Sequence, residues 1–181
     1  MLQKTDKLGG ADYRASLISP SPQFTEELAG RMAKFLREGD LILAFGNLGA
    51  GKTCFARGLA HGLELEGEVA SPSFTYLREY YPSTDEGIAL YHFDCYRLRA
   101  AEEWYEMGFD DYLDGSAIVL IEWPERVLES LPPSYLRLDL GPGDQAEERK
   151  IGLSLPIDME TERRDALLEL WRTFAADEEE E

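Results

Sequence analysis

A glycine-rich stretch at residues 46–53, GNLGAGKT, has the residue types and spacing that bind phosphate. It matches the pattern G-x-x-x-x-G-K-[ST] at every fixed position. Its three glycines let the backbone turn tightly and bring N–H groups close to a polyphosphate. Lys52 would reach the β- and γ-phosphates, and the Thr53 hydroxyl would be a ligand of a phosphate-bound Mg²⁺. The stretch therefore predicts a nucleotide site.

The flanking segments supply the strand and the helix that such a loop requires. Residues 41–45, LILAF, are a short apolar run typical of a buried strand. Beyond the loop, Phe55, Leu59 and Leu63 recur at four-residue spacing, which predicts one face of a helix. The start of that helix would add free N–H donors and the positive end of its dipole. A glycine-rich turn without a ligand is the alternative, and the strand-loop-helix context argues against it.

Hydrolysis needs more than a phosphate loop, because a carboxylate near the metal and a group that orients the attacking water are also required. Asp94 follows the apolar run 88–93, and Glu122 follows the run 117–121. The loop also lies at the carboxyl end of a strand, so both carboxylates are expected beside it. The alternative is that each one merely caps the next turn. The sequence does not separate their two roles.

Three further features accompany these carboxylates. Residues 71–75, SPSFT, place hydroxyls around a stiff proline. They predict either a switch-like segment that senses the γ-phosphate or an ordinary loop entering a strand. Trp123 ends a strand, which favours either a role in the site or core packing. His92 is expected to be a satisfied strand histidine rather than a base, because strand alternation places it opposite its two aromatic neighbours.

Composition limits the classes of protein. The 181 residues fit one domain, and the apolar fraction of 44% is ordinary for a soluble globular chain. No run approaches the length of a membrane span, and the N-terminus has no apolar segment of a secretion signal. Cys54 and Cys95 lie far apart, and with two histidines in the chain a zinc site is not expected. We expect reduced thiols and a cytoplasmic location without membrane contact.

The charge balance bears on possible partners. Thirty-six acidic and 18 basic residues give a net charge of −18. Unaided nucleic-acid binding needs a basic face, because phosphate contacts dominate that affinity. If RNA is involved, we expect a partner protein to hold it.

Hydrophobic pattern and turn signals predict an α/β, P-loop NTPase-type three-layer fold with a mixed parallel and antiparallel central sheet. Residues 76–81 and 88–93 are strand-like on either side of a turn at 82–87, which predicts an antiparallel hairpin. Further helices are expected at 22–37, 100–107, 124–129 and from about Thr161, and further strands at 135–140 and 149–155. The expected organisation is a loose segment or edge strand at 1–20, an ATPase domain at 21–156, a C-terminal helix at 157–176 and an acidic tail at 177–181.

Four motifs, taken in order, resemble one family. They are GNLGAGKT at 46–53, SPSFT at 71–75, HFDCYRL at 92–98 and IEWPE at 121–125. Together they look like TsaE (also called YjeE), the bacterial ATPase of tRNA threonylcarbamoyladenosine biosynthesis, over about residues 20–155. Ser73 stands where the family usually has threonine, and Cys95 where it usually has an apolar residue.

The resemblance implies a compact α/β P-loop fold and weak hydrolysis of ATP with Mg²⁺. It also implies dependence on the TsaB and TsaD partners, which transfer threonylcarbamoyl to the adenosine beside the anticodon in tRNAs that read codons beginning with A. The tRNA would then be met only through those partners.

The resemblance also implies site residues. Asp94, Glu122 and Trp123 would matter for catalysis, and Thr53 and Glu122 for the metal. The nucleotide base would lie near Gln23 and Phe24. The nucleotide-binding set is Gln23, Gly46, Asn47, Leu48, Gly49, Ala50, Gly51, Lys52, Thr53 and Cys54.

Two other functions fit the phosphate loop. A small P-loop kinase would pass the γ-phosphate to a metabolite and usually needs an arginine-bearing lid, for which residues 97–99 are the one candidate. A non-catalytic nucleotide-dependent assembly factor would bind ATP tightly, and Asp94→Ala would leave its function intact.

Overall fold

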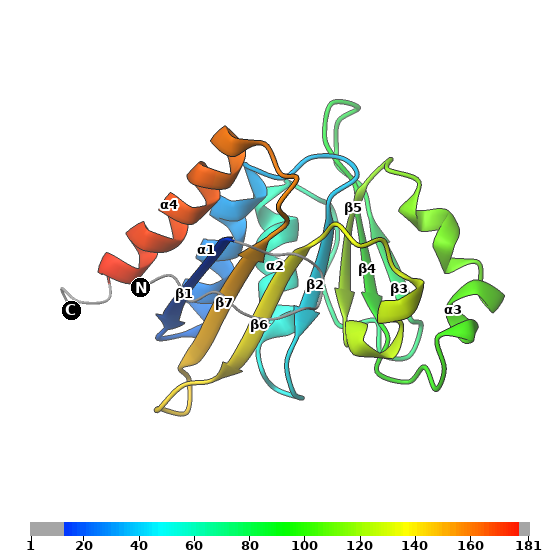
Figure 1. The fold of residues 1–181 in the computed structure, drawn as a ribbon, viewed down its shortest axis with the longest axis horizontal. Helices are drawn as coiled ribbons and strands as arrows, with labels where there is room; N and C mark the ends of the chain where they lie inside the picture. The colour runs from blue at the N-terminus through cyan, green and yellow to red at the C-terminus, as the bar shows by residue number, and fades with distance from the viewer. Residues whose placement is uncertain (1–12, 178–181) are drawn as a thin grey trace.

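The computed structural model describes residues 13–177, which form a twisted seven-stranded sheet with helices on both faces (Figure 1). Residues 1–12 and 178–181, the latter nearly all of the expected acidic tail, lie outside the described residues. In spatial order the strands are β1 (Tyr13–Ser19), β7 (Arg149–Leu155), β6 (Leu136–Pro142), β2 (Leu41–Phe45), β5 (Ile118–Glu122), β4 (Leu90–Asp94) and β3 (Leu77–Tyr80).

The sheet is mixed, as expected. Strand β2 runs parallel to both of its neighbours, β5 and β6, and β5 is parallel to β4. Strands β3 and β4 form the antiparallel hairpin predicted from the turn at 82–87. The antiparallel pairs β6–β7 and β7–β1 extend the other side. The carboxyl ends of β2, β5 and β4 therefore meet at one edge of the sheet.

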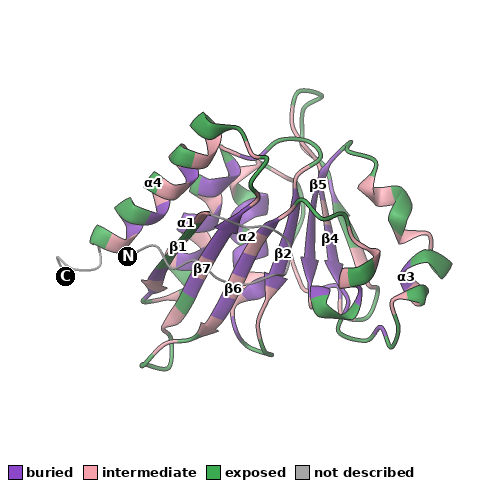
Figure 2. Cartoon of the chain, viewed as in Figure 1, coloured by how far each residue is buried: buried purple, intermediate pink, exposed green. Residues whose placement is uncertain are grey.

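Each face of the sheet packs on its own apolar cluster. Helices α1 (Pro22–Ala33), α2 (Lys52–Gly62) and α4 (Thr161–Asp177) cover one face, and α3 (Glu102–Glu106) with short 3₁₀ turns covers the β4–β5 half of the other. The central strands are buried almost throughout, as Figure 2 shows. Strand β5 is buried at every position, which explains its uninterrupted apolar run.

The α1–α2 contact fixes the helix that follows the phosphate loop. Ser21 caps α1 by accepting a hydrogen bond from the Phe24 N–H at 3.2 Å, with Pro22 in the first turn. A Cβ at Gly58 would lie 2.3 Å from the Glu26 carbonyl oxygen. Glycine therefore allows the two helix backbones to touch.

Helix α4 is part of the body of the structure. One side of the helix is apolar, and its Leu167, Trp171 and Phe174 are all buried in the helix-side cluster. The Phe24 and Phe174 rings meet edge to face at 5.0 Å. Arg163 donates to the Phe35 carbonyl at 2.6 Å, which ties the start of α4 to the end of α1.

Three predicted helices differ from the expectation, and of these α3 covers Glu102–Glu106 rather than 100–107. Helix α1 ends at Ala33 rather than 37, because residues 34–40 form a turn in which Asp40 accepts a hydrogen bond from the Arg37 N–H at 2.8 Å. The helix expected at 124–129 is two 3₁₀ turns, Pro124–Arg126 and Leu128–Ser130, because Val127 between them has φ −132°. Within residues 13–177, no helix is long and apolar enough to cross a membrane.

Candidate functional site

The phosphate loop follows β2 directly, and its glycines have backbone conformations that only glycine adopts easily. Gly46, Gly49 and Gly51 have φ of +148°, +78° and +102°. A Cβ at Gly46 would lie 2.4 Å from the Leu140 carbonyl oxygen and 2.9 Å from Ala50 Cβ. The loop is therefore folded tightly against the end of β6, and the tip of the loop is exposed at Asn47, Leu48 and Gly49.

Lys52 lies across the inside of the loop. Its side-chain Nζ donates to the Gly46 carbonyl at 2.6 Å and to the Asn47 carbonyl at 3.0 Å. The ammonium also lies 4.1 Å from the centre of the Trp123 ring. Burial lowers the pKa of Lys52, and the nearby Glu122 carboxylate opposes that shift most strongly. The site thus holds a poorly solvated cation within the loop.

Glu122 lies beside the start of α2. It is 3% exposed at the end of β5, where it pairs in register with Ala44 of β2 and Asp94 of β4. Its Oε1 accepts a hydrogen bond from the Thr53 hydroxyl at 2.9 Å. The same oxygen lies 2.9 Å from Nε2 of His92. The structure therefore joins the last residue of the phosphate loop to one of the two strand-end carboxylates.

Asp94 is held by a different set of groups. It is 2% exposed, and its Oδ2 accepts hydrogen bonds from Ser71 Oγ at 2.7 Å and from Ser73 Oγ. Its Oδ1 accepts the Tyr96 N–H at 3.0 Å. Segment 71–75 is thus tied directly to the second carboxylate. Phe74, in the middle of that segment, is 83% exposed and lies under the Arg97 guanidinium.

Trp123 changes the direction of the chain directly after Glu122. Its φ of +58° is uncommon for a bulky side chain, and such outliers gather at functional sites. The ring contacts the Lys52 ammonium and the Tyr96 ring, the latter at 4.8 Å between centroids. The ring also packs against the apolar cluster on the α3 side of the sheet. Trp123 therefore both lies beside the phosphate loop and contributes to core packing, the two alternatives that the sequence left open.

The structure places Gln23 and Cys54 close to this edge. Cys54 Sγ contacts the Pro22 carbonyl at 3.3 Å, which brings the start of α1 to the start of α2. Gln23 is exposed in the first turn of α1. The expected base-binding segment and the phosphate loop are therefore neighbours. Burial raises the pKa of the Cys54 thiol.

Two residues have contacts that the sequence did not predict. Arg149, at the start of β7, donates to the Gly49 carbonyl at 3.2 Å and to the Glu148 carbonyl at 2.7 Å, which ties the β6–β7 turn to the phosphate loop. His92 faces away from its aromatic neighbours, as expected, but the side it faces contains Glu122. Strand alternation predicts the side to which His92 points, whereas its hydrogen bond to Glu122 depends on which strand lies next to β4.

A divalent cation at this edge would need ligands from a bound phosphate. Within the described residues, no group of three or more His, Cys, Asp and Glu side chains is placed to hold a metal. Mg²⁺ is commonly bound by one or two protein oxygens together with phosphate oxygens and water. The Thr53–Glu122 pair beside a phosphate loop fits that mode of binding.

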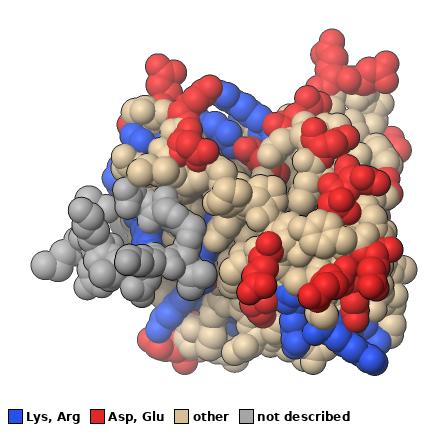
Figure 3. Space-filling model, turned by 45° about the vertical axis from the view of Figure 1, so that its right-hand side comes forward, with Lys and Arg blue, Asp and Glu red and all other residues tan. Residues whose placement is uncertain are grey.

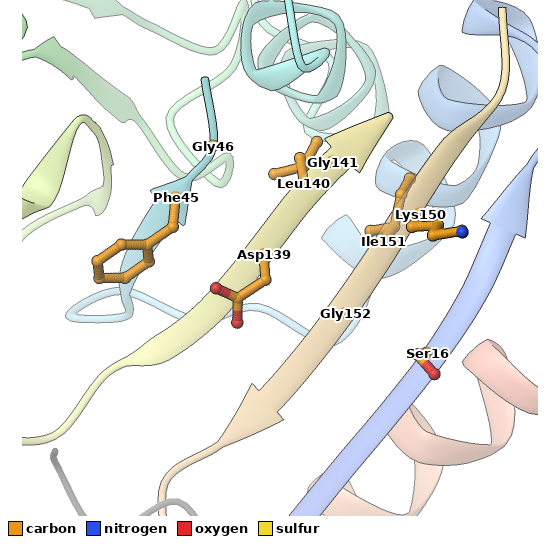
Figure 4. Close-up of a pocket in the computed structure, with 9 residues that line it drawn as sticks. All are labelled: Ser16, Phe45, Gly46, Asp139, Leu140, Gly141, Lys150, Ile151 and Gly152. Atoms are coloured by element: carbon orange, nitrogen blue, oxygen red, sulfur yellow. The ribbon is translucent and has the colours of Figure 1, made fainter. Parts of the chain in front are cut away.

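A separate hollow of about 360 Å³ lies over β6, β7 and β1 (Figure 4). Leu138 and Leu140 pack in the helix-side cluster, so Asp139 between them faces the opposite side of the sheet. The hollow includes Gly46 at its edge, together with Asp139 and Lys150. The carboxylates of Asp94 and Glu122 do not line it.

Comparison with known proteins identifies the family. A family model described as "Threonylcarbamoyl adenosine biosynthesis protein TsaE" matches residues 19–151. The tRNA threonylcarbamoyladenosine biosynthesis protein TsaE of Streptomyces coelicolor is 45% identical over 125 residues, 67% of this chain and 83% of that protein. The protein of the same name from Treponema pallidum is 37% identical over 123 residues, 68% of this chain and 88% of that protein.

A solved structure agrees with these sequence matches. The crystal structure of Bacillus subtilis YdiB superposes with a TM-score of 0.70 at 30% sequence identity, covering 89% of this chain and 95% of that one. The expected α/β fold with a mixed sheet is thereby confirmed. The chain belongs to the TsaE family of threonylcarbamoyl adenosine biosynthesis proteins.

Proposed function

We propose that this chain is a Mg²⁺-dependent ATPase of tRNA threonylcarbamoyladenosine biosynthesis. The observation that carries the proposal is the hydrogen bond between Thr53 and Glu122, at the point where the glycine loop enters α2. It joins a hydroxyl suited to Mg²⁺ with a buried carboxylate beside the phosphate loop. Relatives named for this biosynthesis share the greater part of the chain.

The residues present fit ATP and Mg²⁺. The close approach of Gly46 to the Leu140 carbonyl leaves room for backbone but none for a side chain. Lys52 already directs its ammonium into the loop. In the proposal the loop N–H groups and Lys52 bind the phosphates, while Thr53, with Glu122 behind it, holds the cation. Bound Mg²⁺ would neutralise charge that develops on the phosphates.

The remaining side chains have roles in orientation. Asp94 accepts three hydrogen bonds, and in the proposal it orients the attacking water while Glu122 stays with the metal. Trp123 covers Lys52 on its outer side and keeps water away from the ammonium. Gln23 and Cys54 would lie near the nucleotide base, since they flank the loop from the α1 side.

We propose that the TsaB–TsaD pair is the partner, that it holds the tRNA, and that the work is done in the cytoplasm. The surface supports an indirect contact with RNA. Figure 3 shows Asp and Glu spread over one face, with Lys and Arg in smaller groups between them, and the whole chain has a net charge of −18. Segment 71–75 and residues 96–99 are the proposed partner face, because Phe74 and Tyr96 are exposed beside Asp94.

The test is steady-state ATP hydrolysis by the full chain, alone and with the TsaB–TsaD pair of the same organism. We expect low activity alone, a rise with the pair, and loss of that rise in Lys52→Ala and in Glu122→Ala. Lys34→Ala and Glu129→Ala are matched controls, because both side chains are exposed and both residues lie outside the phosphate loop and the strand ends beside it. Equal rates with and without the pair would refute partner gating, and phosphate transfer to a small acceptor would favour a kinase.

A further inference from the structure

A buried histidine shares the carboxylate oxygen that Thr53 uses. His92 is fully buried in the middle of β4, and its Nε2 lies 2.9 Å from Oε1 of Glu122. The Thr53 hydroxyl bonds to that same oxygen at 2.9 Å. A carboxylate oxygen can only accept, so His92 donates its Nε2 proton. The oxygen is held from two sides, by a strand and by the start of a helix.

Packing alone does not account for a histidine at this position. Nδ1 of His92 is buried and has no hydrogen-bond partner among the described residues. A leucine would fill similar space without an orphaned polar atom, and unpartnered buried groups are costly. Position 92 thus holds a residue that costs stability, and Glu122 is its one side-chain hydrogen-bond partner among the described residues.

The two anchors of Glu122 differ in what they do when a cation is bound. Under the proposed function, Thr53 turns its oxygen to the cation and keeps its hydroxyl proton for Glu122. Among the described residues, His92 forms no hydrogen bond with the loop, so its bond to Glu122 can stay unchanged. Its position is fixed by β4, which pairs with β5 along the whole length of both strands.

We propose that His92 is a positioning residue that holds the Glu122 carboxylate so that Thr53 presents its oxygen to Mg²⁺. This inference rests on the proposed function, because it concerns the same cation. Groups that orient metal-binding side chains in this way typically change metal affinity by about 10- to 100-fold when they are removed.

The test measures ADP affinity by calorimetry with Mg²⁺ and in excess chelator. The ratio of the two dissociation constants gives the Mg²⁺-dependent gain in ADP affinity, and the measurement does not depend on ATP hydrolysis. We expect His92→Leu to lower that gain about 10-fold or more, with affinity in chelator unchanged within about twofold. His92→Gln keeps an N–H donor of similar reach and should retain most of the gain. His92→Asn is equally polar but too short to reach Glu122, so it should lose the gain.

Folding and packing are controlled separately. Phe93→Leu alters the same strand on its other face, so it should lower the melting temperature and leave the Mg²⁺-dependent gain intact. If His92→Leu does not fold, the positioning role is tested by comparing the Mg²⁺-dependent gain in ADP affinity of His92→Gln with that of His92→Asn. A wild-type chain that binds ADP equally with and without Mg²⁺ would refute the proposed function. A normal wild-type gain that Asn and Gln variants retain equally, or lose equally, would refute the positioning role alone.

Discussion

Gly46→Ala tests whether the close contact between the phosphate loop and β6 sets the shape of the site. An alanine Cβ at this position would lie 2.4 Å from the Leu140 carbonyl oxygen, and both atoms belong to the backbone framework. Relief requires the end of β2 or of β6 to move. Overpacking of this kind costs about 1–3 kcal/mol. The positive φ of +148°, which lies outside the left-handed helical region, adds a conformational cost of about 1–3 kcal/mol.

Gly49→Ala is the matched control within the same loop. Its φ is also positive, at +78°, with a conformational cost of about 1–2 kcal/mol, but no atom lies within 4 Å of the added Cβ. The difference in unfolding free energy between the two variants is therefore expected to be dominated by the steric contribution of about 1–3 kcal/mol. In a chain of this size that corresponds to a difference in melting temperature of about 2–12 °C.

Urea unfolding followed by fluorescence measures both variants, and calorimetry measures their affinity for ADP. We expect Gly46→Ala to be the less stable and the weaker binder, because the displaced loop no longer aims its N–H groups at one point. Equal unfolding free energies for the two variants would refute the argument. So would a Gly46→Ala chain that is destabilised but binds ADP normally, since the contact would then not shape the site.

Two further predictions concern side chains around the loop. Trp123→Leu removes the aromatic face over the buried Lys52 ammonium, a contact worth about 0.5–2 kcal/mol. The affinity for ATP should therefore fall about 2- to 30-fold, and it should fall less in Trp123→Phe. Equal ATP affinities for the two variants would contradict this prediction. Burial raises the pKa of Cys54 and of Cys95, so both thiols are mostly protonated at pH 8. Iodoacetamide should therefore modify them more slowly than it modifies the thiol of free glutathione, and the reaction should become faster as the pH rises. Mass spectrometry should find the half-buried Cys54 modified before the buried Cys95, and ADP should slow the former; reaction of Cys95 first would be inconsistent with the fold.

The sequence predicted the elements whose pattern depends on local periodicity. Strand β5 and the hairpin of β3 and β4 follow from apolar runs and a turn, and both are present. The helix expected at 124–129 is two 3₁₀ turns instead, because Trp123 before it has a φ of +58° and Val127 within it has a φ of −132° and a ψ of 9°, neither of which continues an α-helix. The Trp123 ring contacts Lys52 and Tyr96, which are distant in the sequence, and no local pattern predicts such contacts.

The sequence predicts those parts of the site whose position depends only on where strands end. Asp94 and Glu122 were placed beside the loop because carboxyl ends of parallel strands meet there, and their register confirms that they are neighbours. The bond from His92 to Glu122 depends on β4 lying next to β5, and the contact of Arg149 with Gly49 depends on the path of the β6–β7 turn. Neither the order of strands nor the path of a turn is encoded in residue spacing.

The surroundings of the two carboxylates favour a division of roles that the sequence could not make. Both partners of the Glu122 carboxylate, His92 and Thr53, belong to regular elements, a strand and a helix. Asp94 is held largely by segment 71–75, which is irregular. A metal site benefits from a fixed ligand, whereas a water-orienting group can be gated by movement of the loop that holds it.

The exposed Phe74 makes that loop accessible from outside. A partner that contacts this ring acts one residue from Ser73, which donates directly to Asp94. Displacing the segment would release Asp94 without disturbing the Thr53–Glu122 pair. Under the proposed function, partner contact would therefore change hydrolysis while leaving Mg²⁺-dependent nucleotide binding intact, and that separation is what a gated ATPase would require.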